Sequence, residues 1–273
     1  MDNSSIGNRM KTYENVTRTY LTRRTPVIIR LDGKAFHTFT RGFAKPFDEV
    51  FVKTMQQTMQ YLCENVEGCV LGYTQSDEIT LVLCDYKKLT SQAWFDDNVQ
   101  KMCSISASMA TLAFNAAYRQ NVKEWNVDCY ADMDATCLNR SRVQYDKYVS
   151  KFDKAMFDSR VFNIPKEEVN NCLLWRQQDA TRNSIQAVAQ ANFSQKQLHE
   201  KSCNELQEML WQEKGINWNN LPTHLKRGSC CIKQHFEVDN NGVKTQRSKW
   251  VVDKEIPIFS QNTDYVNSRI IFD

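Results

Sequence analysis

Hydrophobic and polar positions follow two different periods along the chain. Runs of β-branched and aromatic residues between turn-forming residues predict strands. Apolar residues that recur every three or four positions predict helices, and polar stretches without a period predict loops. The predicted elements, in order, are a strand at 25–31, a helix at 48–66, a hairpin of 69–74 and 77–83, a helix at 91–119, a loop at 128–153, a strand at 160–164, helices after residue 165, and a hairpin of 229–238 and 243–252.

Several of these elements have a signal at one end. The polar pair Gln75-Ser76 is predicted to form the centre of the first hairpin, although it is not a favoured turn pair. Pro165 suits the first turn of a helix. Ser194-Gln195-Lys196-Gln197 has the spacing of a capping box, and Lys214-Gly215 is a C-terminal stop. Asn240-Asn241-Gly242 predicts a tight turn in the second hairpin.

The order of the elements indicates the fold class. Strand, helix, hairpin, helix, strand, helices and hairpin is not the regular alternation that gives a parallel sheet. It predicts an α+β chain in which helices pack on an antiparallel sheet, with a helical and hairpin C-terminal part. We expect two regions, 1–165 and 166–273, that form one integrated unit.

Composition narrows the class of protein. The 273 residues are 41% hydrophobic and 25% charged, as in ordinary globular proteins. No run reaches the roughly eighteen apolar residues of a membrane helix. The first ten residues are polar and lack the apolar core of a signal peptide. We therefore expect a cytoplasmic protein with no membrane partner.

The ten cysteines show no zinc-binding or redox pattern. No Cys-x-x-Cys occurs, and several of the cysteines lie in apolar stretches where a thiol packs as a small hydrophobic group. We expect them to be reduced and inert. Those in apolar stretches are Cys63, Cys84, Cys103 and Cys172.

Positive charge is concentrated at the start of the chain. The formal net charge is +3, but residues 1–45 contain nine lysines and arginines and only three acidic residues. A basic segment around a candidate anion site suits a polyphosphate or RNA partner. Taken alone, the same segment is equally typical of a solvated basic surface.

Two acidic residues at strand ends are the first candidates for chemistry. Asp32 closes the first strand, and Asp77 stands beside the hairpin turn. If that strand lies next to the hairpin, both carboxylates converge at one end of the sheet, where hard oxygen ligands suit Mg²⁺. Two such ions can activate an attacking hydroxyl and stabilise a leaving pyrophosphate.

Glu78 is an auxiliary candidate, because it points to the other face of its strand if Asp77 faces the site. A bulge would bring it in. Asp-Gly and Asp-Glu are also common solvated pairs, so ordinary turn residues remain the alternative for each motif alone.

The segment after Asp32 is a candidate phosphate loop. Gly33 allows a tight turn in which consecutive N–H groups can form an anion-binding nest for a triphosphate. Taken alone, a histidine such as His37 is more often an ordinary packed or surface residue than a functional one. No Walker loop, serine-histidine-acid arrangement or metal-binding helix spacing occurs. The basic residues that can add charge to the loop are Lys34, His37, Arg41 and Lys45.

These residues resemble, in order and spacing, the tRNA(His) guanylyltransferase family. The matching segments are Ile29–His37, Phe43–Pro46, Tyr73–Glu78 and Trp94-Phe95, with looser matches at 157–161, 175–177 and 221–228. The resemblance implies a palm domain like that of conventional polymerases, of ferredoxin-like topology, over residues 1–165. It also implies nucleotide addition to the 5′ end of tRNA, a homotetramer, and ATP, GTP and other nucleoside triphosphates as substrates.

The resemblance further implies roles for particular residues. Asp32 and Asp77 bind both Mg²⁺ ions, and the Gly33 carbonyl ligates one. Asp32, Asp77 and Glu78 are the implied catalytic residues. The implied nucleotide-binding residues are Asp32, Gly33, Lys34, Ala35, Phe36, His37, Lys45, Ser76, Asp77 and Lys101, and the implied tRNA contacts are Arg176, Asn183, Lys226 and Arg227.

One motif departs from the family pattern. True tRNA(His) guanylyltransferases follow Trp-Arg-Gln with a His-Ile-Asn-Asn-type motif, but Thr181 stands here where the histidine is expected, while Asn183 is kept. This resembles the bacterial-type guanylyltransferase-like proteins, which repair 5′-truncated tRNAs by templated 3′-to-5′ addition. We therefore expect tRNA 5′-end repair. The alternatives are true G−1 addition, a nucleotide cyclase-like palm and a non-catalytic tRNA-binding protein.

Overall fold

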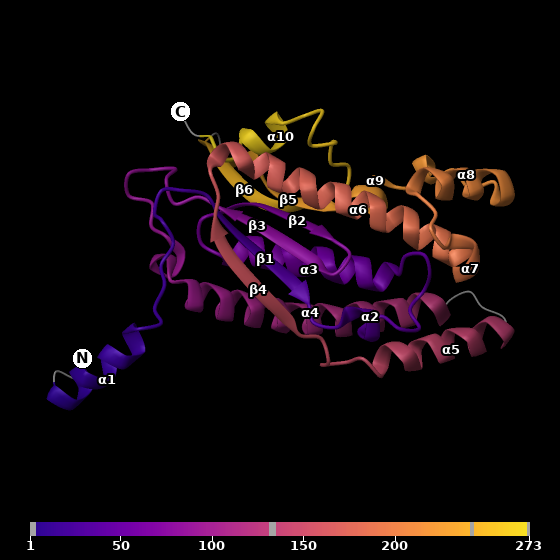
Figure 1. Cartoon of the computed structure of the whole chain (residues 1–273), viewed down its shortest axis with the longest axis horizontal. Helices are drawn as coiled ribbons and strands as arrows, with labels where there is room; N and C mark the ends of the chain where they lie inside the picture. The colour runs from indigo at the N-terminus through magenta and orange to yellow at the C-terminus, as the bar shows by residue number, and fades with distance from the viewer. Residues whose placement is uncertain (1–3, 131–134, 241–242, 272–273) are drawn as a thin grey trace.

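A six-stranded antiparallel sheet forms the centre of the molecule (Figure 1). The computed structural model describes residues 4–130, 135–240 and 243–271. The strand order is β4-β1-β3-β2-β5-β6, so the sheet is antiparallel throughout, as the order of elements predicted. The strands are β1 (Val27–Gly33), β2 (Cys69–Gln75), β3 (Glu78–Leu83), β4 (Phe157–Asn163), β5 (Ser229–Asn240) and β6 (Val243–Asp253).

Helices cover both faces of this sheet. The long helices α3 and α4 pack against one face, and α6 crosses the other (Figure 1). Among the described residues, no helix is both long and apolar enough to cross a membrane. The helices are α1 (Ser5–Asn15), α2 (Phe36–Phe39), α3 (Glu49–Asn65), α4 (Val99–Tyr130), α5 (Ala135–Val149), α6 (Val169–Asn192), α7 (Gln195–Leu198), α8 (Cys203–Lys214), α9 (Thr223–Arg227) and α10 (Asp264–Asn267), with 3-10 turns η1 (Trp94–Asp97), η2 (Lys166–Glu168) and η3 (Trp218–Asn220).

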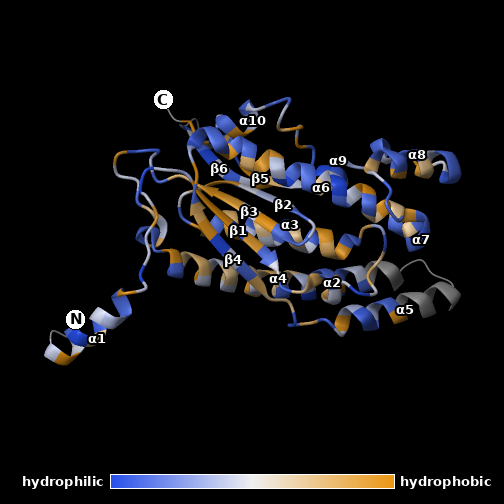
Figure 2. Cartoon of the chain, in the orientation of Figure 1, coloured by the Kyte–Doolittle hydropathy of each residue, from blue (hydrophilic) through white to orange (hydrophobic). Residues whose placement is uncertain are grey.

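The strands supply a separate apolar core to each layer. In β1, Ile29 and Leu31 join the cluster beneath α3 and α4, whereas Ile28 joins the cluster beneath α6. Successive side chains of a strand point to opposite faces, so the two cores share the same strands. The hydrophobic colouring along β1 and β3 in Figure 2 agrees with strands that are buried over most of their length.

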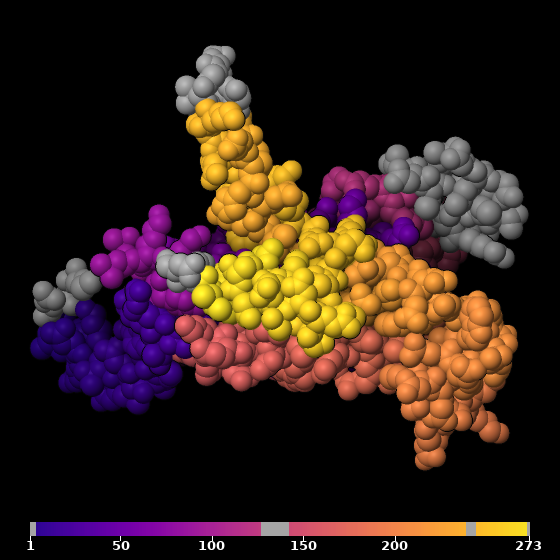
Figure 3. Space-filling view, turned by 90° about the horizontal axis from the view of Figure 1, so that it is seen from above, coloured from indigo at the N-terminus to yellow at the C-terminus, as the bar shows by residue number. Residues whose placement is uncertain are grey.

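Most local signals match the structure. Ser194 and Gln197 make their capping box, and α8 ends at left-handed Gly215. A second capping box, Ser202 with Glu205, divides this region into α7 and α8. The second hairpin forms as predicted, although residues 241–242 of its turn lie outside the described residues. Its outer part extends beyond the sheet as a two-stranded arm (Figure 3).

The helix predicted at 91–119 has different ends. Its start moves to Val99, because Phe95 and Asp96 adopt left-handed conformations and form the turn η1. Its end moves to Tyr130.

The loop predicted at 128–153 is wrong for most of its length. Helix α5 occupies Ala135–Val149, while residues 131–134 lie outside the described residues. Tyr148 explains why α5 docks, since its buried ring joins the core beneath α3 and α4. The remaining sequence is too polar to show a clear helical period.

The cysteines that the structure describes as free are Cys63, Cys69, Cys84, Cys103, Cys172, Cys203, Cys230 and Cys231. Burial raises the pKa of the Cys63 and Cys230 thiols. These thiols are therefore protonated at neutral pH, in keeping with an inert role.

Candidate active site

Three carboxylates lie in one row across the end of the sheet. Asp32 on β1 is directly opposite Glu78 on β3 and Asp158 on β4. Residues that are directly opposite share a face of the sheet, and here that face is the one that α6 partly covers. Sequence reasoning missed Asp158 because the predicted strand began at Arg160, and only the pairing of β4 with β1 brings it to Asp32.

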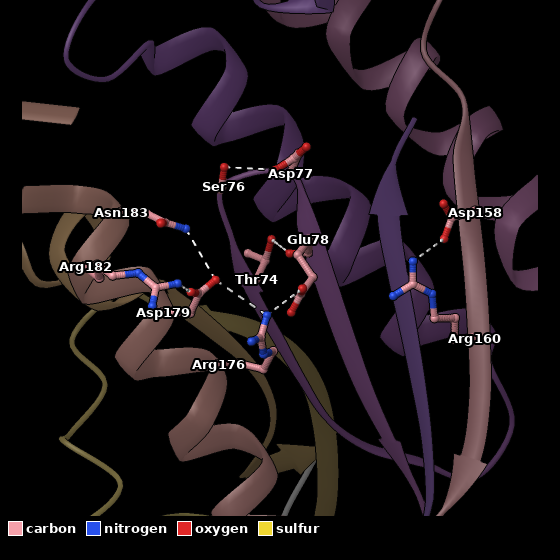
Figure 4. Close-up of polar contacts among 10 residues, drawn as sticks. All are labelled: Thr74, Ser76, Asp77, Glu78, Asp158, Arg160, Arg176, Asp179, Arg182 and Asn183. Atoms are coloured by element: carbon pink, nitrogen blue, oxygen red, sulfur yellow. Dashed lines mark hydrogen bonds and ion pairs between the residues drawn. The ribbon is translucent and has the colours of Figure 1, made fainter. Parts of the chain in front are cut away.

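Asp77 approaches the same row from the turn between β2 and β3. The turn is centred on Ser76 and Asp77, one residue later than predicted, because Gln75 pairs with Glu78 and Ser76 takes a left-handed conformation. The Gly33 amide donates a hydrogen bond to the Asp77 carbonyl at 3.1 Å, which ties this turn to the end of β1. The Ser76 hydroxyl donates to the Asp77 carboxylate at 3.0 Å (Figure 4).

The electrostatics of the two aspartates suit a cation. Burial raises the pKa of Asp32, and the neighbouring Asp77 and Asp158 carboxylates raise it further. Burial also raises the pKa of Asp77, opposed by the Ser76 hydrogen bond and the nearby His37. Carboxylates that repel each other in this way are stabilised by a bound cation.

The donor set fits Mg²⁺, which uses one or two carboxylates and completes its coordination with water and substrate phosphates. Asp32, Asp77 and the Gly33 carbonyl are hard oxygen donors at one end of the sheet. Within the described parts of the chain, no group of three or more His, Cys, Asp or Glu side chains forms a complete metal site. A substrate would therefore have to supply some of the ligands.

Glu78 has a partner of its own. Arg176 on α6 donates to its carboxylate at 3.0 Å, and both side chains are buried (Figure 4). Burial raises the pKa of Glu78, and Arg176 opposes that rise. Glu78 shares a face with Asp32 because Asp77 lies in the turn, so the expectation that strand alternation turns Glu78 away from the site does not apply.

The ion pair continues along α6. The Arg176 guanidinium lies 3.6 Å from Asp179, which also pairs with Arg182 and accepts a hydrogen bond from Asn183 at 3.4 Å (Figure 4). Asn183 is exposed, whereas Arg176 is only 8% exposed. Of these two predicted tRNA contacts, Asn183 is the accessible one.

The loop after Asp32 turns sharply. A Cβ at Gly33 would lie 2.4 Å from the Phe36 ring, so no other residue fits without displacing that ring. Ala35 has a φ of 54°, a left-handed conformation that is uncommon outside glycine and often marks functional sites. This turn of the backbone buries the Phe36 side chain and leaves Lys34 and His37 exposed.

The amides of Gly33 and Lys34 bond to the carbonyls of Asp77 and Met156. An anion-binding nest would therefore begin at Ala35.

A cavity of about 280 Å³ opens beside the Ser76 turn. Its wall includes Lys45 from the α2–α3 connection, Asn183 from α6 and His224 from α9. Ser76 and Lys45, both predicted nucleotide-binding residues, thus lie at one hollow. Asp48 also lines the cavity, and its carboxylate accepts hydrogen bonds from the Ala44 amide at 2.9 Å and the Tyr148 hydroxyl at 2.6 Å.

Two predicted residues lie away from this group. Lys101 is in the first turn of α4, and one and a half turns later Ser106 bonds to Ser159 of β4 at 2.8 Å. This places Lys101 toward the opposite end of the sheet from Asp32. Lys226 is buried, and its ammonium donates to the Asn219 carbonyl at 2.6 Å. Arg227, next to it, is half-buried and is predicted to contact tRNA.

Comparison with known proteins finds similar sequences and structures among tRNA(His) guanylyltransferases and proteins like them. A bacterial tRNA(His) guanylyltransferase-like protein in complex with ATP is 43% identical, with a TM-score of 0.82, and the match covers 98% of this chain and 100% of that one. A structure of such a protein in complex with GTP is 41% identical, with a TM-score of 0.74, over 97% and 98% of the two chains. The tRNA(His) guanylyltransferase of Saccharomyces cerevisiae is 27% identical over 76% of this chain and 82% of its own length.

Family membership rests on the region that holds the carboxylates. The model of the tRNAHis guanylyltransferase family matches residues 7–165, more than half of the chain. This region includes Asp32, Asp77 and Glu78 and four of the six strands. The chain therefore belongs to the tRNA(His) guanylyltransferase family of nucleotidyltransferases.

Proposed function

We propose that this protein repairs tRNA by adding nucleotides to a 5′ end, in the 3′-to-5′ direction and against a template strand. The observation that carries the proposal is the row of carboxylates Asp32, Glu78 and Asp158, joined by Asp77, at the mouth of a tight glycine turn. Thr181 in place of the family histidine supports templated repair over the addition of a single guanylate.

The reaction needs an activated 5′ end. The 5′-monophosphate attacks the α-phosphorus of ATP, so a new phosphoanhydride forms and pyrophosphate leaves. The 3′-hydroxyl of the incoming nucleotide then attacks the activated 5′ phosphate, and AMP leaves. Two Mg²⁺ ions, when bound, would lower the pKa of that hydroxyl and neutralise phosphate charge.

The protein's own groups would orient this chemistry. Asp32, Asp77 and the Gly33 carbonyl would hold the ions, and the exposed Lys34 and His37 would contact the triphosphate. The cavity beside Ser76 and Lys45 is the natural place for the nucleotide base, because it opens next to the carboxylates and has polar groups at its rim. Phe36 buries its ring beneath Gly33 and thereby fixes the turn.

A second function, true G−1 addition to tRNA(His), is supported by the named activity of the yeast relative. It predicts that guanylate is added whatever base lies opposite. We also propose that the protein is a cytoplasmic homotetramer. Residues 1–165 and 166–273 are proposed to form one integrated unit, because strands from both regions belong to the same sheet.

The test is direct. Purified protein is mixed with Mg²⁺, nucleoside triphosphates and a tRNA that lacks its first nucleotide, and the 5′ ends are sequenced with each of the four bases at the template position. We expect the added base to follow the template. Addition of guanylate against every base would establish the second function, and unextended ends would refute both.

Variants test the metal assignment within the same assay. We expect Asp32→Ala and Asp77→Ala to abolish extension. Asp146→Ala, which removes an exposed carboxylate on α5, should extend normally. Substantial extension by either active-site variant would contradict the two-metal assignment.

A further inference from the structure

Two arginines occupy the next row of the same sheet face. Arg30 on β1 is directly opposite Arg160 on β4, as Asp32 is opposite Asp158. Like charges in directly opposite positions destabilise a sheet. Arg160 has an exposed, distant partner in Asp158, at 3.9 Å, and Arg30 has no carboxylate within 4.0 Å anywhere in the described chain. The carboxylates of the neighbouring row act on Arg30 only at longer range, so its guanidinium keeps N–H donors that a phosphate can accept from.

An exposed aromatic ring stands beside this row. Trp175 on α6 is 51% exposed, and the Arg30 guanidinium lies 5.4 Å from the centre of its ring. The buried Arg176 guanidinium lies 3.5 Å from the same ring and holds it in place from within the protein. The Arg160 side chain is 57% exposed and Arg30 is half-buried, so solvent reaches this row of the sheet.

Flat aromatic rings next to guanidinium groups are the usual platform for unpaired nucleotides. A base stacks on the ring irrespective of its identity, and the arginines contact the phosphate. Arg30 and Arg160 lie two residues from the carboxylate row, about 7 Å along the strands. That distance is close to the length of one nucleotide, so a chain segment can reach from this row to the reacting end.

We propose that Trp175, Arg30 and Arg160 bind an unpaired nucleotide of the RNA substrate, on the strand that runs past the recessed 5′ end. Trp175 stacks the base, and the two arginines bind the phosphate. The proposal rests on the proposed function, because an end that lacks its 5′ nucleotide leaves the opposite nucleotide without a partner. The cavity beside Ser76 remains for the incoming nucleotide.

The experiment compares two RNA hairpins with the same stem, one blunt and one with its 5′ end recessed by one nucleotide. Binding is measured by fluorescence anisotropy without nucleoside triphosphates, so that no turnover occurs. We expect the wild-type protein to bind the recessed hairpin about ten-fold more tightly than the blunt one, a typical contribution of one stacked base. Trp175→Ala should abolish this preference, and Trp175→Phe should keep most of it.

The chain supplies a matched control. Trp211 on α8 is 54% exposed, and Trp211→Ala should leave the preference unchanged. Arg30→Gln and Arg160→Gln should weaken binding of the recessed hairpin and reduce its slope of log K against log salt by about 0.7–1 each. A preference that survives in Trp175→Ala, or is missing from the wild type, overturns the proposal.

Failure of this site and failure of the proposed function are distinguishable. A protein that prefers the recessed hairpin through Trp175 but never extends it supports the site and refutes the repair activity. A protein that extends truncated tRNA, while Trp175→Ala binds like the wild type, refutes the site and leaves the repair activity standing.

Discussion

The two faces of the sheet use the same strands for different purposes. In β1, Ile29 and Leu31 point into the layer of α3 and α4, while Arg30 and Asp32 point to the opposite side. The first layer is packed with rings in edge and stacked contacts, and the second face has rows of charge beside its own apolar cluster. The rings are Phe36, Phe39, Phe43, Phe51, Phe114, Tyr118, Tyr148 and Phe157.

This difference shows how the site is held rigid. Phe36 belongs to the aromatic cluster and also lies directly beneath Gly33, at the end of β1. Asp32 is next to Gly33, so packing on one face positions the carboxylate on the other. We infer that the aromatic face contributes most of the stability and that the charged face contributes most of the chemistry.

The largest test of this comparison is Phe114→Ala. Phe114 is fully buried and contacts Phe36 and Phe157, with ring centres 5.4 and 5.5 Å apart. Loss of a buried phenyl ring leaves a cavity, so we expect the free energy of unfolding in urea to fall by about 4 kcal/mol. Trp175→Ala, on the other face, should cost less than about 1 kcal/mol. Equal costs would contradict the division between the faces.

Arg176→Met tests an ion pair that is buried between α6 and the sheet. Removal of the guanidinium leaves the Glu78 carboxylate without its partner, and one of its oxygens already lacks a hydrogen bond. We expect a loss of about 3 kcal/mol in the free energy of unfolding. The double variant Glu78→Met with Arg176→Met should recover most of it, because apolar side chains of similar size replace both charges. No recovery would show that Arg176 stabilises the fold through other contacts, such as Trp175.

The sequence contained enough local information for most of the fold. β-branched runs predicted β1 and the hairpins, because a buried strand needs little beyond apolar side chains and turn residues at its ends. Helix α5 was missed because most of its residues are polar, and the role of Tyr148 as its buried anchor is visible only once the core beneath α3 and α4 has formed. The first hairpin turn was displaced by one residue because the left-handed conformation of Ser76 has no sequence signal.

The candidate site was partly predictable for the same reason. Asp32, Gly33 and Asp77 stand next to recognisable strand ends, so their convergence could be anticipated from local pattern. Asp158 and Arg160 could not be found in this way, because their position depends on the pairing of β4 with β1, more than 120 residues apart in the chain. The partner of Glu78 is likewise set by the packing of α6.

The prediction with the smallest expected effect concerns a buried carboxylate that has no partner like the Arg176 of Glu78. Asp97, just before α4, is buried, and one of its oxygens has no hydrogen-bond partner. Burial and the nearby Asp85 raise its pKa to about 6, from an ordinary value of 3.8. Between these two pH values the folded protein keeps a proton that the unfolded chain has lost, so stability falls as the pH rises toward 6.

Asp97→Asn should therefore unfold at a higher urea concentration than the wild type at pH 8, and the gain should disappear near pH 4. Asparagine tolerates the left-handed conformation at this position, with its φ of 61°, so the backbone is not a cost. Glu78 provides the contrast, because Arg176 opposes the rise in pKa that burial causes there. A gain of equal size at pH 4 and pH 8 would mean that the asparagine acts through its hydrogen bonds and that charge burial at Asp97 is unimportant.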